Sequence, residues 1–286
     1  MKLHFLKTQW SDMIILESNG KVALVDTGFE EQYEQLEDYL KKLGVSRITF
    51  ILLTHFHRDH YGSLTALIQN FQVDRVYMKE YSGLDCTTAW GSVADDAYRS
   101  SEMDKYREMV DVISAGSELI PVEGLSVIPF DQYELKLFHT TNSIREIYED
   151  EAFPDTYHRI CFSENQNSIG IFLQADGKNI FLGGDILDHD STHPKANHVC
   201  CQVAQLIGEQ IDIYKAPHHG TVHTACAKAL EIFKPKIAVI TNEDDYLSKE
   251  SDVYDNLKRA NPEVRILLTE QEDVVIDTET VTIPRV

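Results

Sequence analysis

The stretch that decides the fold is ITFILLTHFHRDH, residues 48–60. Five of its first six residues are apolar, a pattern typical of a strand that is covered on both faces of a sheet. Three histidines and an aspartate follow, and these side chains bind divalent metal ions. Residues two apart in an extended segment point to the same side, so His55 and His57 can bind one ion together. Asp59 and His60 follow where the chain turns into a helix, and they can face a second ion nearby.

The alternative interpretation of this cluster is a solvated polar turn with incidental histidines. Three other apolar runs, however, also end in metal-binding side chains. Asp26 follows KVALV, Asp185 follows KNIFLGG, and His218-His219 follows IDIYKAP. Because strand ends line one edge of a sheet, we expect these side chains to converge there. The recurrence at four strand ends favours a metal site over a polar turn.

Short β-type runs alternate with helical patterns in both halves of the chain. Asn19-Gly20 separates two apolar runs and is typical of a hairpin turn. One stretch, residues 142–159, is acidic, aromatic and weakly periodic, and a connection of this length is usually functional. We therefore expect residues 1–286 to form a single α/β domain with an inserted loop at 142–159. Helices are expected near residues 30–44, 196–208, 222–233 and 250–260.

Composition narrows the range of partners. The net charge is −21, from Asp+Glu 47 against Lys+Arg 26, and no basic run is present. Such a charge repels polyanions such as DNA and also anionic membrane surfaces. No window approaches the ~18 apolar residues of a membrane span, and the first residues lack the apolar core of a signal peptide. We therefore expect a small-molecule substrate and neither a nucleic-acid nor a membrane partner. The sequence does not indicate the oligomeric state.

The cysteines indicate the redox compartment. Their number is odd and their spacing shows no pairs, which is typical of reduced packing thiols and favours a cytoplasmic protein. The five are Cys86, Cys161, Cys200, Cys201 and Cys226.

The motif HxHxDH at residues 55–60, with DTG upstream and GGD and HHG downstream, resembles the metallo-β-lactamase superfamily of metal-dependent hydrolases. The resemblance implies a four-layer αββα sandwich with a dinuclear metal site at one edge. In this likeness Asp185 bridges the two ions, and Asp26 supports the ligand loop without binding metal. The ions are expected to be zinc, with manganese or iron as alternatives. The residues that the likeness assigns to metal are His55, His57, Asp59, His60, Asp185 and His219.

A narrower likeness concerns the branch that contains the hydrolase domain of competence-type DNA-uptake proteins and the phosphorylcholine esterases. In that branch the second histidine of HHG is the usual ligand, which assigns His219 to metal. The likeness leaves His218 as a substrate-side acid or hydrogen-bond donor. Asp59 is expected both to bind metal and to orient the attacking water.

The sequence departs from the superfamily pattern at one ligand of the first ion. The third histidine, expected shortly before the run SIGIFLQ, is missing, and Asn165 and Ser168 lie in its place. His139, His158 or a water are the candidates to fill the position. We expect Lys215, just before HHG, to extend its amine to solvent at a strand end.

These residues predict a hydrolase whose nucleophile is a hydroxide held at the dinuclear site. A small phosphodiester or phosphomonoester is the expected substrate. The alternatives are a carbonyl ester, lactone or thioester, redox chemistry at two irons, and a metal-binding protein without turnover.

Overall fold

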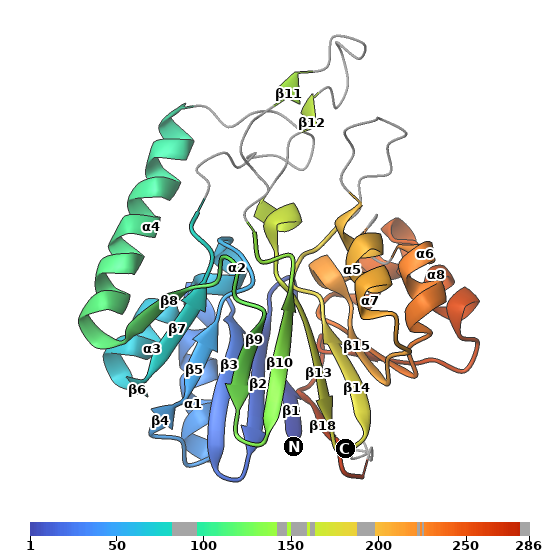
Figure 1. Cartoon of the computed structure of the whole chain (residues 1–286), viewed down its shortest axis with the longest axis horizontal. Helices are drawn as coiled ribbons and strands as arrows, with labels where there is room; N and C mark the ends of the chain where they lie inside the picture. Colours follow the sequence, from blue (N-terminus) through green and yellow to red (C-terminus); the bar gives the residue numbers. More distant parts are fainter. Residues whose placement is uncertain are drawn as a thin grey trace.

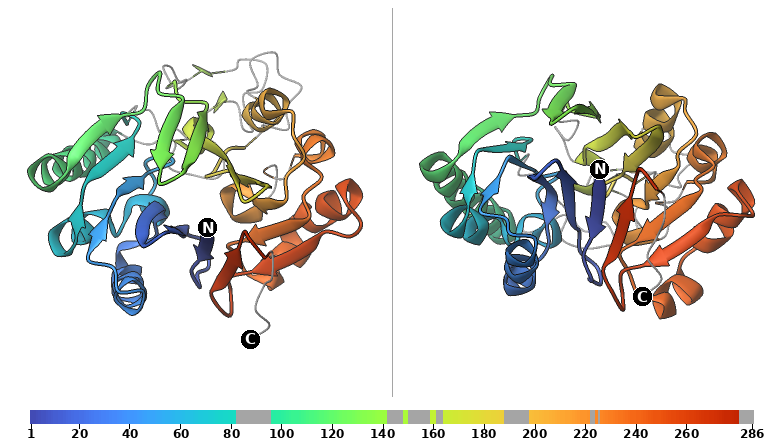
Figure 2. Two further views of the ribbon diagram at one scale, coloured as in Figure 1. Left: turned by 60° about the horizontal axis from the view of Figure 1, so that its bottom comes forward. Right: turned by 90° about the horizontal axis from the view of Figure 1, so that it is seen from below.

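The computed structural model contains two seven-stranded sheets packed face to face, with helices on both outer sides (Figure 1). The structure describes residues 1–81, 96–141, 148–149, 159–160, 164–187, 198–221, 224 and 226–280. The first sheet has the order β18-β1-β2-β3-β5-β7-β8 and the second the order β17-β16-β15-β14-β13-β10-β9. Figure 2 shows the two sheets from their ends, with one group of helices outside each.

The strands of the first sheet are β1 (Lys2–Phe5), β2 (Met13–Ser18), β3 (Lys21–Thr27), β5 (Phe50–Leu52), β7 (Arg75–Met78), β8 (Glu118–Pro121) and β18 (Val274–Asp277). Those of the second are β9 (Val127–Phe130), β10 (Tyr133–Phe138), β13 (Gly170–Ala175), β14 (Lys178–Leu182), β15 (Ile213–Lys215), β16 (Ile237–Ile240) and β17 (Arg265–Leu268). Two further sheets have two strands each. One pairs β4 (Arg47–Ile48) with β6 (Gln72–Val73), and the other pairs β11 (Tyr148–Glu149) with β12 (Arg159–Ile160).

The helices beside the first sheet are α1 (Tyr33–Lys42), α2 (Arg58–Tyr61), α3 (Leu64–Asn70) and α4 (Asp96–Gly116). Those beside the second are α5 (Val199–Ile207), α6 (Ala227–Phe233), α7 (Asp244–Glu250) and α8 (Val253–Ala260). Three 3-10 turns are η1 (Glu30–Gln32), η2 (Glu164–Asn167) and η3 (Pro217–Gly220). None of the helices in the described ranges combines the length and the apolar character needed to cross a bilayer.

Three apolar clusters hold the layers together. One lies between the sheets and joins residues such as Phe50 and Ile171. A second packs the first sheet against α1, α3 and α4, and a third packs the other sheet against α5 to α8. This is an αββα sandwich, so the predicted fold class is confirmed. Burial of apolar side chains on both faces of each sheet explains the continuous apolar runs of β5 and β14.

Parallel pairing places the functional side chains at one edge. β3, β5 and β7 run parallel in the first sheet, as do β14, β15 and β16 in the second. Their carboxyl ends therefore lie at the same edge of the sandwich, towards the top of Figure 1.

The expected hairpin at Asn19-Gly20 joins β2 to β3, with Ser18 opposite Lys21. Most of the inserted loop predicted at 142–159 lies outside the described residues, apart from the β11–β12 pair. Helix α4 has no counterpart among the sequence predictions. Over residues 100–116, the part of α4 whose side chains the structure describes, a narrow stripe that includes Met109 and Ile113 is buried, so the sequence shows weak helical periodicity.

Candidate metal centre

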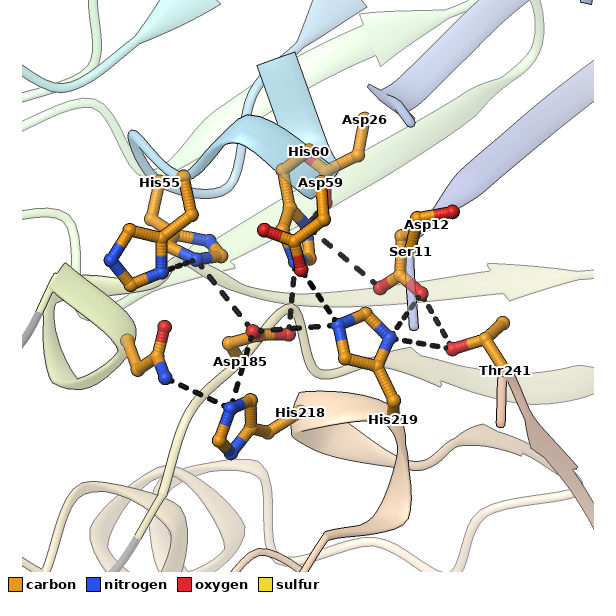
Figure 3. A network of polar contacts seen from close by, with 12 residues as sticks. Ser11, Asp12, Asp26, His55, Asp59, His60, Asp185, His218, His219 and Thr241 are labelled. Carbon is orange, nitrogen blue, oxygen red and sulfur yellow. Dashed lines mark hydrogen bonds and ion pairs between the residues drawn. The ribbon is translucent and has the colours of Figure 1, made fainter. Parts of the chain in front are cut away.

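The four strand ends singled out in the sequence meet in one buried cluster (Figure 3). After β5 the chain bends over residues 54–56, His57 is extended, and α2 begins at Arg58, which turns the chain within the HxHxDH motif. Asp185 follows β14 after two glycines, and η3 carries His218 and His219 after β15. Gly184 has φ +51°, and a Cβ there would lie 2.8 Å from Thr54 Cβ. A glycine at this position therefore allows the β14 turn to approach the start of the histidine motif.

The first group of donors comprises His55, His57 and Asp185. His55 Nε2 lies 3.1 Å from His57 Nδ1 and 3.7 Å from Asp185 Oδ2. Two ligands of one tetrahedral ion, each about 2.0–2.1 Å from it, are separated by about 3.4 Å. The spacing of this group therefore fits a single shared ion.

The second group comprises Asp59, His60, Asp185 and His219. His60 Nε2 is 3.3 Å from Asp59 Oδ2 and 3.2 Å from Asp185 Oδ1. His219 Nε2 is 3.1 Å from Asp59 Oδ2 and 3.6 Å from Asp185 Oδ2. Asp185 thus belongs to both groups, and each of its oxygens faces imidazole nitrogens.

The donor set fits divalent cations. His60 Nε2 and Asp185 Oδ1 are fully buried, and neither atom makes a hydrogen bond. Buried polar atoms almost always have partners, so this facing pair indicates a place for a bound ion. His55, His57 and Asp185 would hold one ion, and Asp59, His60, Asp185 and His219 the other.

Buried carboxylates lie behind both imidazoles of the second group. His60 Nδ1 is 2.8 Å from Asp26 Oδ2, which also accepts from the Thr54 hydroxyl. His219 Nδ1 is 3.3 Å from Asp12 Oδ1 and 2.9 Å from the Thr241 hydroxyl. A carboxylate beside Nδ1 keeps the ring proton there and leaves Nε2 directed at the ion. Asp26 supports the ligand loop in the way that the sequence predicted.

The electrostatics keep the ligands ionised. Burial alone would raise the pKa of Asp185, but nearby imidazoles, His60 foremost, lower that pKa well below its ordinary value. The pKa of Asp59 is lowered in the same way against the effect of burial. Burial lowers the pKa of His60, yet three carboxylates, Asp185 foremost, raise it well above the ordinary value. Negative charge gathered around His60 favours any cation that takes the place of its proton.

His218 is the residue of the HHG pair that stands outside both groups. Its Nε2 is 3.9 Å from Asp185 Oδ2 and accepts a hydrogen bond from Asn165 Nδ2 at 3.0 Å. Its Nδ1 therefore carries the proton and donates to the Thr221 hydroxyl at 2.7 Å. Burial of the ring lowers the pKa of His218 to about 4. The geometry thus separates the two histidines, with His219 in the second group and His218 outside both.

No further histidine joins the first group within the described residues. His139 directs Nδ1 to the Ser168 carbonyl at 3.1 Å and is absent from the group, while His158 lies outside the described residues. The Ser168 hydroxyl accepts from the Asp185 amide at 3.1 Å. The position of the missing histidine is therefore occupied by residues that support Asp185 and contact His218.

The sequence analysis did not identify the supporting role of three residues: Asp12, Lys215 and Thr241. The expectation that Lys215 reaches solvent is wrong, because its side chain is fully buried and ion-paired with Asp12. Its position between two apolar residues at the end of β15 was the only available signal, and it does not reveal a partner from the other sheet.

Comparisons with known proteins agree with this geometry. Residues 11–127 match the family model of the metallo-beta-lactamase superfamily. An endoribonuclease of Saccharomyces cerevisiae is 35% identical over 68 residues, which cover 22% of this chain and 9% of that protein. The coenzyme F420H2 oxidase of Methanothermobacter marburgensis is 21% identical over 230 residues, 79% of this chain and 53% of that protein. The chain thus spans about half the length of this oxidase and a much smaller part of the endoribonuclease.

Solved structures show the same architecture. Igni18, a metallo hydrolase of Ignicoccus hospitalis, is 14% identical, with a TM-score of 0.52 over 97% of this chain and 99% of that one. CmlA, a diiron β-hydroxylase of Streptomyces venezuelae, is 11% identical, with a TM-score of 0.53 over 96% of this chain and 53% of that one. These neighbours show that the chain has the metallo-β-lactamase fold, and the match to the superfamily's family model is confined to residues 11–127.

Proposed function

We propose that the chain is a metal-dependent hydrolase that acts on a small phosphodiester or phosphomonoester. The observation that carries this proposal is the position of Asp185, a buried carboxylate that belongs to both donor groups. A carboxylate shared in this way suits two ions held close together, the arrangement used for in-line displacement at phosphorus.

Two divalent ions, when bound, would lower the pKa of a shared water to about 7 and neutralise charge that develops on the substrate. The chain's own residues perform the remaining tasks. Asp59 is the most exposed carboxylate of the second group, with 22% of its side chain accessible, whereas only 1% of Asp185 is accessible. Asp59 is therefore the residue suited to orient a water or to accept its proton.

His218 is the residue proposed to act on the leaving group. Its Nε2 lies 3.9 Å from Asp185 Oδ2, and 30% of its side chain is exposed, against 1% for Asp185. In the present arrangement its Nε2 accepts from Asn165, so donation requires that Nε2 first gain a proton. A substrate that displaces the Asn165 amide would place its leaving oxygen at that nitrogen.

The charge of the chain supports a small substrate over a nucleic acid. A net charge of −21 opposes a long polyanion, whereas a single phosphate needs only the two ions. The match to the endoribonuclease covers 9% of that protein, so it does not support RNA cleavage by this chain.

A second candidate is oxygen chemistry at two irons. CmlA is a diiron hydroxylase and covers 96% of this chain, and the relative with the longest match described above is an oxidase. The donors are imidazoles and carboxylates, which suit iron as well as zinc. The metal in the protein as isolated therefore separates the two candidates.

The test measures nitrophenol release from bis(p-nitrophenyl) phosphate, p-nitrophenyl phosphate and p-nitrophenyl acetate by protein loaded with zinc or manganese. Release from a phosphoester that is lost in Asp185→Asn supports the proposal. Release from the acetate alone would overturn it in favour of carbonyl chemistry. Iron in the isolated protein, with oxygen consumption and no ester cleavage, would favour the second candidate. Two bound ions with neither activity would indicate a metal-binding protein without turnover.

A further inference from the structure

Asp12 and Lys215 form an ion pair in the interior, between the two halves of the sandwich. Asp12 immediately precedes β2 of the first sheet, and Lys215 is the last residue of β15 in the second. The Lys215 side chain is 0% and that of Asp12 1% accessible to solvent. Removing two charges from water is costly, and an apolar pair is often at least as stable. A buried pair at this position therefore calls for a role other than stability.

Asp12 lies directly behind the imidazoles of the second group. Its Oδ1 accepts from the Thr241 hydroxyl at 2.7 Å and is 3.3 Å from His219 Nδ1. Its Oδ2 contacts Lys215 and is 4.0 Å from His60 Nδ1. Figure 3 shows the carboxylate beside His219, on the side away from Asp185.

Asp12, Asp26 and His60 also constitute a third set of side chains with metal-ligand spacing. The ammonium of Lys215 already contacts Asp12 and supplies positive charge to this set. The Lys215 ammonium compensates the charge of Asp12 in the interior, and the Thr241 hydroxyl donates a hydrogen bond to the same carboxylate.

We propose that Asp12 and Lys215 are a positioning pair for the second ion. Lys215 holds Asp12 in place across the two sheets, and Asp12 fixes the proton of His219 on Nδ1. His219 Nε2 is then presented to the ion beside Asp59 and Asp185. The inference rests on the dinuclear centre of the proposed function and not on the identity of the substrate.

The test compares Asp12→Asn, Lys215→Met and the double variant by competition of zinc with a chromophoric chelator. Lys236→Met is the matched control, because Lys236 pairs with Asp212 at 2.7 Å and the two residues directly precede β16 and β15. The control removes an exposed Lys–Asp pair at the end of β15 opposite to Lys215. Asp12→Asn keeps the shape of the side chain, so it carries the test if Lys215→Met does not fold. Thermal unfolding of each metal-free variant is measured in parallel.

We expect each single variant to lower the affinity for one of the two zinc ions about 10–100-fold, the usual effect of losing a residue that orients a ligand. The affinity for the other ion should not change. In the double variant the loss of zinc affinity should be smaller than the sum of the two single losses, because the two residues act as one unit. Lys236→Met leaves both affinities unchanged.

Unchanged zinc affinities with altered unfolding temperatures would overturn the inference and make the pair purely structural. An equal loss of affinity for both ions would overturn it as well, since that result indicates a general disturbance of the structure. A wild-type protein that binds two ions without cleaving esters would remove the phosphoesterase proposal but leave this inference testable. A wild-type protein that does not bind two ions would overturn both.

Discussion

The two halves of the candidate metal centre differ in what lies behind their histidines. In the second group, His60 and His219 each direct Nδ1 towards a buried carboxylate, Asp26 or Asp12. In the first group, His55 has the Thr54 hydroxyl at 3.0 Å from its Nδ1, and no third histidine joins it among the residues that the structure describes. A carboxylate behind an imidazole raises its basicity and fixes its orientation. The second position should therefore bind its ion more tightly than the first.

The largest effect should come from the residue that the two halves share. Asp185→Asn removes a ligand charge from both groups, so ester cleavage should fall by at least about 100-fold, because ion-based stabilisation is worth several kcal/mol. Turnover of bis(p-nitrophenyl) phosphate at saturating zinc measures this effect. Undiminished turnover in the variant would mean that Asp185 does not join two ions.

The next prediction compares the substitution of one histidine from each donor group. His219→Gln should abolish the tighter zinc-binding step, and His57→Gln should abolish the weaker one, because each residue belongs to a single group. Isothermal titration of metal-free protein with zinc separates the two steps. The asymmetry is disproved if both variants lose the same step.

A smaller effect is expected from the carboxylate behind His60. Asp26→Asn keeps the size of the side chain but weakens its acceptor for His60 Nδ1, so the tighter ion should bind about 10–100-fold less strongly. Chelator competition measures this change. Thr54→Val, which removes the hydroxyl beside His55, should affect the weaker ion instead.

The last effect, on folding stability and not on metal binding, concerns the segment that occupies the place of the missing histidine. Lys79 is 6% exposed and donates to the Asn167 carbonyl of η2 at 2.5 Å. Burial lowers its pKa to about 7, whereas an unfolded lysine titrates near its ordinary value of 10.5. Above pH 7 the unfolded chain therefore binds more protons at this residue than the folded chain. Stability should rise with pH from about 7 towards 10, by at most about 1.4 kcal/mol per pH unit.

Urea unfolding of wild type and Lys79→Met between pH 6 and 9.5 tests this sign. The stability difference between the two proteins should shift in favour of wild type as the pH increases. A difference that stays constant across this range would show that Lys79 remains charged in the folded protein.

The side chains that form the two donor groups could be picked out in the sequence because their signal is local. HxHxDH places four donors within six residues, and Asp185 and His219 each follow an apolar run directly. The apolar runs predicted a sheet-rich α/β domain, and the four layers of the sandwich were implied by the resemblance to the superfamily. The pairing of Asp12 with Lys215 was not predictable, because Asp12 precedes β2 and Lys215 ends β15, and the residues next to each do not indicate the other. Their meeting depends on how the two sheets pack, and single-chain periodicity contains no information about that packing.

The pairing of strands at the edge of the first sheet was unpredictable for the same reason. β1 is four residues long and pairs with β18 from the opposite end of the chain, so its partner cannot be inferred from adjacent residues. Helix α4 was missed for a different reason, since most of its surface is solvated and its buried stripe is narrow.

The most direct test of the shared centre is the number of zinc ions that each chain retains after dialysis, measured by inductively coupled plasma mass spectrometry. Asp131→Asn serves as the matched control, because Asp131 accepts from Ser18 and Asn19 at the turn of the β2–β3 hairpin, the end of these strands away from the centre. We predict two ions in wild type and in Asp131→Asn, and at most one in Asp185→Asn. Two ions retained by Asp185→Asn with unchanged affinity, or a single ion in wild type, would contradict a dinuclear centre built on Asp185.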